Sequence, residues 1–245
     1  MHDTLSFLSI ALRTGVTCSF EHLEQAGIFS GTSKLEVYGK IASFLDEHGL
    51  EANPPADSPD CEWHDKRSFT RKENDADFQI AFKEAITREE CHTVEFKQTL
   101  ILDVNRKLNH AGATREQLCP SYIPHEVIKT ITAFLNADGG TLLIGVADDL
   151  TIHGVEGDYP YLNGDPTRDT WELYLRNIFQ ERIPEYRTLK GYINCSHVQV
   201  ENLTVYVIIV KPRKERISVC YPMENKSTEL VYVRDGNRTL KLKAK

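Results

Sequence analysis

Hydrophobic residues in the second half of the chain follow two different spacings. Residues 125–137 place apolar side chains about every 3.6 positions, on one face of a helix, and residues 169–183 do the same. Residues 141–147 (TLLIGVA) are a short, mostly apolar run, which is typical of a strand buried on both faces of a sheet. This mixture of spacings indicates a fold that contains both helices and strands.

Shorter segments complete the pattern. Strands are predicted at 93–97, 191–200, 203–211 and 230–234, and a short amphipathic helix at 76–88. The pair Glu201-Asn202 joins two of these strands as a turn. Together the segments predict a mixed α+β domain, of the α/β class, in which helices pack on a mixed sheet.

The first 75 residues have a different character. Apolar residues recur at helical spacing in 5–13 and again in 34–48. Residues 51–68 then combine prolines with charged residues and show no periodicity, as a linker or long loop would. We therefore predict a small helical N-terminal region with a linker at residues 1–75, and one domain at residues 76–245.

The composition indicates the class of protein and its cellular compartment. The 245 residues are 40% hydrophobic and 27% charged, as in ordinary globular proteins, and no stretch approaches the roughly 18 apolar residues of a membrane span. The six cysteines are scattered without a CxxC pair. We expect a soluble, intracellular protein, cytoplasmic, with free thiols and no contact with membranes.

The charge is unevenly distributed along the chain. The formal net charge is −7, yet residues 187–245 contain twelve basic residues and only five acidic ones. The C-terminal third can therefore present a cationic face to phosphates, or simply carry a solvated surface of lysine and arginine. Candidate nucleic-acid-binding residues are Lys211, Arg213, Lys214, Arg216, Arg234, Arg238 and Lys241.

Acidic residues gather at the ends of two predicted strands. Glu95 and Lys97 share one face of the first strand, and Glu90 lies a short segment upstream. Asp148 and Asp149 follow the strand 141–147, at the edge where open α/β sheets carry functional groups.

Such carboxylates repel one another unless a cation neutralises them. Mg²⁺ or Mn²⁺ held there would lower the pKa of a bound water and support phosphodiester hydrolysis. In the alternative interpretation, Glu90 and Glu95 are solvated or paired with Lys97 and Arg238, and Asp148-Asp149 is only a turn.

Four stretches, taken in order, resemble a known family. They are ECHTVEFK (90–97), FLNADGG (134–140), LLIGVADD (142–149) and YVRDGNRT (232–239). The chain from about residue 89 to residue 242 resembles the core of the schlafen proteins and the schlafen-type, Alba-like DNA-binding domain. That resemblance implies an Alba-like lobe with helices packed on a mixed sheet. It also implies that the segment between Lys97 and Ile123 is longer than is usual in the family.

The resemblance also implies a function. Animal schlafens use two glutamates and one aspartate for metal-dependent cleavage of structured RNA, including tRNA. By position these are Glu90, Glu95 and Asp148, with Lys97 as electrostatic partner. Asp149 is the alternative third carboxylate, because Ala147 stands where the family often has an acidic residue. A noncatalytic nucleic-acid-binding or regulatory module of the same fold is the second hypothesis.

Two further expectations concern assembly and zinc. Animal schlafen cores contain two copies of this lobe and this chain has one, so we expect a homodimer. Cys195, His197 and Cys220 resemble part of the family's zinc site, but a fourth ligand is missing. We therefore expect buried free thiols in preference to structural zinc.

Overall fold

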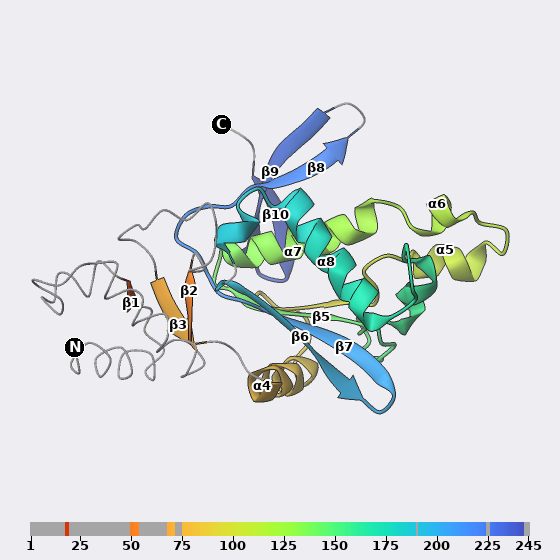
Figure 1. Cartoon of the computed structure of the whole chain (residues 1–245), viewed down its shortest axis with the longest axis horizontal. Coiled ribbons are helices and arrows are strands. Elements are labelled where there is room, and N and C mark those ends of the chain that lie inside the picture. The colour runs from red at the N-terminus through yellow and green to blue at the C-terminus, as the bar shows by residue number, and fades with distance from the viewer. Residues whose placement is uncertain are drawn as a thin grey trace, which may run out of the picture. The chain divides into compact units, whose positions relative to one another are not determined.

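The computed structural model describes residues 75–189, 191–223 and 226–242, together with three short strands within the first 74 residues (Figure 1). Its contacts divide the chain into two units. The first consists of residues 1–74 and 187–191, and the second of residues 75–186 and 192–245.

Three short strands form an antiparallel sheet in the first unit. They are β1 (Cys18–Ser19), β2 (Leu50–Asn53) and β3 (Ser68–Arg71), in the order β1-β3-β2. The hydrophobic spacing did not predict these strands, and β2 and β3 overlap the two ends of the segment predicted to be a linker. The helices predicted at 5–13 and 34–48 lie outside the described residues.

A four-stranded mixed sheet forms the centre of the second unit. Its order is β4 (Val94–Lys97), β5 (Gly140–Ile144), β7 (Leu203–Val210) and β6 (Ile193–Val200). Strands β4 and β5 are parallel, and the other neighbours are antiparallel. The mixed α+β class predicted from the sequence is confirmed.

Helices cover both faces of this sheet (Figure 1). Helix α4 (Asp75–Ile86) packs Phe78 and Phe82 against one face, where Phe96 of β4 is fully buried. Helices α7 (Tyr122–Leu135) and α8 (Arg168–Arg182) lie on the opposite face. Apolar and polar residues alternate along β4 because of this arrangement. Its apolar residues face α4, and its polar residues face α7.

A second antiparallel sheet packs against α7. It contains β8 (Val219–Met223), β9 (Lys226–Asp235) and β10 (Arg238–Leu242), with β9 in the middle. The sequence predicted only the residues 230–234 of β9. A tight turn joins β9 to β10, and Gly236 adopts a φ of 60° there, which glycine tolerates without strain.

The long connection between β4 and α7 contains two short helices, α5 (Val104–Asn109) and α6 (Arg115–Leu118). Two 3-10 helices, η1 (Glu156–Tyr161) and η2 (Tyr186–Thr188), flank α8 in the sequence. Asp158 of η1 is buried and binds the start of the connection between β4 and α7. Its carboxylate accepts hydrogen bonds from the Leu100 amide (2.9 Å), the Leu102 amide (3.3 Å), the Thr99 hydroxyl and Trp171 Nε1 (3.0 Å).

Candidate functional site

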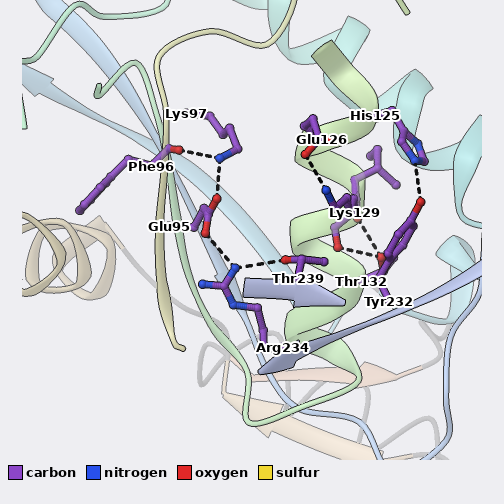
Figure 2. A network of polar contacts seen from close by, with 11 residues as sticks. Glu95, Phe96, Lys97, His125, Glu126, Lys129, Thr132, Tyr232, Arg234 and Thr239 are labelled. Carbon is purple, nitrogen blue, oxygen red and sulfur yellow. Dashed lines mark hydrogen bonds and ion pairs between the residues drawn. The ribbon is translucent and has the colours of Figure 1, made fainter. Parts of the chain in front are cut away.

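Glu95 and Lys97 lie on the edge strand β4 and point toward α7 and the β9–β10 hairpin (Figure 2). The carboxylate of Glu95 is buried, with 9% of the residue exposed. Its Oε1 accepts a hydrogen bond from Lys97 Nζ at 2.5 Å, and its Oε2 accepts one from Arg234 Nη1 at 2.8 Å. Both oxygens of Glu95 are therefore engaged by cations of the same domain.

Arg234 ties the second sheet to β4. Its side chain is 2% exposed. Nη2 donates to the carbonyl of Cys91 at 2.6 Å, Nη1 also donates to Thr239 Oγ1 at 3.1 Å, and the guanidinium stands 5.1 Å from the centre of the Phe134 ring. The sequence placed Arg234 among the phosphate-binding candidates, but the structure places it in a buried ion pair, out of reach of solvent.

Glu90 reaches the same edge from the segment before β4. Its Oε1 accepts a hydrogen bond from the Phe96 amide at 3.0 Å. Burial is the main cause that raises the pKa of Glu90, and the negative charges of Glu95 and Asp148 raise it further, against the lowering effect of the Phe96 amide and Lys97. Glu95 and Asp148 therefore both lie within electrostatic range of Glu90.

Asp148 and Asp149 form an exposed turn after β5. Asp149 accepts a hydrogen bond from the Thr151 amide at 2.9 Å, and this bond is the main cause that lowers the pKa of Asp149. Leu150 completes the turn with a φ of 68°. The Asp149 side chain thus stabilises the turn through the Thr151 amide. The charge of Asp148, by contrast, helps to raise the pKa of Glu90.

The arrangement does not match a metal site as it stands. Among the described residues, no three His, Cys, Asp or Glu side chains are placed to hold a metal ion. Glu95, the central candidate ligand, instead accepts a hydrogen bond from Lys97 on one carboxylate oxygen and from Arg234 on the other.

The remaining cationic candidates differ in exposure. Arg213 is mostly covered and pairs with Glu185 (3.0 Å) and Glu215 (3.3 Å). Lys211 is half-buried at the end of β7. The residues that project into solvent are Lys214, Arg216, Arg238 and Lys241. These four residues, called the exposed cations below, are the part of the predicted basic surface that a phosphate can reach directly.

Sequence reasoning missed the polar side chains of α7. Lys129 pairs with Glu126 at 2.9 Å and stands 6.0 Å from the centre of the Tyr232 ring. His125 is buried 3.1 Å from the Tyr232 hydroxyl, and burial lowers its pKa to about 4. Tyr232 is itself 6% exposed, so it packs in the interior and offers no ring for stacking bases. Only the apolar face of α7 was used in the prediction, although the i,i+3 spacing of Glu126 and Lys129 was visible.

The residues weighed for zinc lie on different sheets. Cys195 and His197 share strand β6, and Cys220 is on β8. His197 Nε2 accepts a hydrogen bond from Arg168 Nη1 at 2.9 Å.

Comparison with known proteins identifies the family. The Schlafen, AlbA_2 family matches residues 90–243, and the chain therefore belongs to it. Membership of this family indicates a function connected with nucleic acid. Within the described residues, no helix combines the length and the apolar character needed to cross a bilayer.

One solved structure of low sequence identity matches about two thirds of the chain. A crystal structure of the DIP2311 protein from Corynebacterium diphtheriae is 16% identical, with a TM-score of 0.41. The match covers 67% of this chain and 30% of that one, so the chain spans about a third of the length of that protein. No curated protein matches the chain.

Proposed function

We propose that residues 75–242 form a nucleic-acid-binding module that does not need a metal ion and does not cleave its ligand. The observation that carries this proposal is the pair of contacts that the Glu95 carboxylate makes with Lys97 and Arg234. Two internal cations satisfy its carboxylate, and the side chain of one of them, Arg234, is 2% exposed. The residue that would be the central metal ligand of a nuclease thus acts as a structural anion.

Metal binding at Glu95 would cost energy mainly at Arg234. A metal ion that took over the Glu95 carboxylate would leave the buried guanidinium of Arg234 without its anionic partner. Removing one partner of a buried ion pair costs about 3–5 kcal/mol. Metal binding at Glu95 would have to offset this cost.

Family membership and the exposed cations support nucleic acid as the ligand. Cations on the surface bind phosphates through counterion release, without reading the sequence. On the schlafen resemblance, we propose structured RNA such as tRNA as the preferred ligand.

Equilibrium binding to fluorescent tRNA, measured by anisotropy in EDTA and again with Mg²⁺ or Mn²⁺, tests the proposal. We expect binding in EDTA, and we expect Lys214→Glu/Arg216→Glu to weaken it and flatten its salt dependence. Lys83→Glu, at an exposed lysine of α4, is the control for charge reversal at another site. Binding that requires the divalent ion, or that ignores Lys214 and Arg216, would refute the proposal.

A metal-dependent endoribonuclease is the second candidate. It is favoured by one observation, the pKa of Glu90, which Glu95 and Asp148 help to raise. Carboxylates that repel one another at a single edge are common where a cation binds.

Incubation of tRNA with the protein and Mn²⁺ or Mg²⁺, followed by gel electrophoresis, separates the two candidates. Asp148→Asn is the sharpest control, because Asp148 is exposed and its replacement leaves the interior intact. Cleavage by the native protein that disappears in Asp148→Asn would establish the nuclease. An intact tRNA with both proteins would favour the binding module.

A further inference from the structure

The connection between β4 and α7 carries a hollow that the site described above does not use. Helices α5 and α6 lie at one end of the domain, beyond the sheet (Figure 1). Between them is a hollow of about 620 Å³, lined by Arg106, His110, Ala111, Gly112, Ala113 and Gln117.

Specific contacts fix the walls of this hollow. The side chain of Asp103 caps α5 by accepting from the Arg106 amide at 2.9 Å. Thr114 and Gln117 form a reciprocal capping box at the start of α6. Arg115 Nη2 donates to the carbonyl of Tyr161 at 2.7 Å and to Asn163 Oδ1 at 2.8 Å, so α6 is attached to the end of η1.

The lining offers hydrogen-bond donors and no carboxylate. The side chain of Arg106 is 43% exposed, and its ion pair with Asp103 is loose, with Nε 3.8 Å from Oδ2. The Oε1 atom of Gln117 accepts from the Thr114 amide at 3.0 Å, so its NH₂ group is the part that remains to donate. Arginine, histidine and amide donors on one concave surface suit an anion, and arginine suits phosphate in particular.

We propose that this hollow, which we call the α5–α6 hollow, binds a phosphate group of the nucleic-acid backbone. The inference rests on the proposed nucleic-acid binding and adds a second contact to the exposed cations. It also gives a role to the connection that the resemblance marked as unusually long. A backbone phosphate here positions the nucleic acid and carries no sequence information.

Gln117→Glu is the most discriminating variant. Glutamate at this position of a capping box serves the same backbone amide as glutamine, so α6 keeps its cap. The change nevertheless places a negative charge in the hollow and removes an amide donor. We expect weaker binding to tRNA and to other nucleic acids alike, by on the order of three- to tenfold at moderate salt, with an unchanged melting temperature.

Arg106→Gln tests the cation itself. Loss of one phosphate contact should make the slope of log K against log salt shallower by about one. Lys83→Glu on α4 again serves as the control for a change of net charge away from the hollow. Native affinity and native salt slope in both Gln117→Glu and Arg106→Gln would overturn the inference.

The binding experiments distinguish a hollow that does not bind phosphate from a protein that does not bind nucleic acid at all. If the Lys214→Glu/Arg216→Glu variant binds poorly while Gln117→Glu binds normally, the exposed cations bind nucleic acid without the α5–α6 hollow. If the native protein binds no nucleic acid, both fail. Titration with inorganic phosphate, followed by NMR shifts of the Gly112 amide, separates backbone recognition from free-anion binding; saturation at micromolar phosphate would contradict a backbone contact.

Discussion

Replacing Arg234 with methionine tests whether the buried ion pair holds the two sheets together. Methionine keeps much of the length of the side chain but removes the charge and the donors to Glu95, Cys91 and Thr239. Glu95 keeps Lys97 as its remaining cation, and the Cys91 carbonyl loses its bond from the guanidinium. We expect the free energy of unfolding to fall by about 3–5 kcal/mol, the usual cost of breaking a buried pair.

Urea denaturation followed by tryptophan fluorescence measures this change. The chain has two tryptophans, and Trp171 of α8 is fully buried in the second unit. A Trp63→Phe background therefore makes the fluorescence report on this unit. Arg238→Met, on the same hairpin but exposed, is the matched control and should change stability by no more than about 0.5 kcal/mol.

The double variant Glu95→Gln/Arg234→Met tests the cause of the cost. If an uncompensated charge is responsible, removing both charges should cost about 1–3 kcal/mol less than the sum of the two single changes. Purely additive effects, or a cost below about 1 kcal/mol for Arg234→Met, would refute the reasoning.

The remaining predictions concern the interior and assembly. Asp158→Asn should lower the free energy of unfolding by about 3 kcal/mol in the same urea assay, because an amide NH₂ would face donors that now bond to a carboxylate; a stability equal to that of the native protein would contradict it. The pKa of His125 is depressed in the folded state to about 4, so its contribution to stability is present above the ordinary value of 6.5 and is lost as the pH falls toward 4. NMR titration of the imidazole should find it neutral at pH 5.5, and a charged ring there would contradict the burial argument. Light scattering with bound tRNA should give the mass of a dimer, whereas a strict monomer would reject the expected homodimer.

Local patterns were enough to predict much of the central sheet. The run TLLIGVA indicated a strand buried on both faces, and β5 lies between β4 and β7 with helices on either side. The apolar residues predicted to face inward on α7 are buried, but Thr130, Thr132 and Ala133 are buried as well, because α7 contacts both sheets. In both segments the signal lies within a few turns or residues of the chain, where periodicity reports burial directly.

Contacts between distant residues could not be predicted in this way. Arg234 and Glu95 are 139 positions apart, and Asp158 binds the Leu100 amide across 58 positions. The count of basic residues treated Arg234 and Arg238 alike, yet the first is buried and the second exposed. Charged residues are mostly exposed, and a residue such as Arg234 is buried only because the tertiary fold supplies its partner, Glu95.

The bond between Arg234 and Glu95 has a consequence for biosynthesis. Strand β4 leaves the ribosome long before β9 has been translated, so during that interval the Glu95 carboxylate lacks Arg234, its second cation. Contacts of such large sequence separation form slowly, because a long loop must close before they are made. The nascent domain therefore passes through a stage in which the Glu95 carboxylate is without Arg234, and translation of β9 ends that stage.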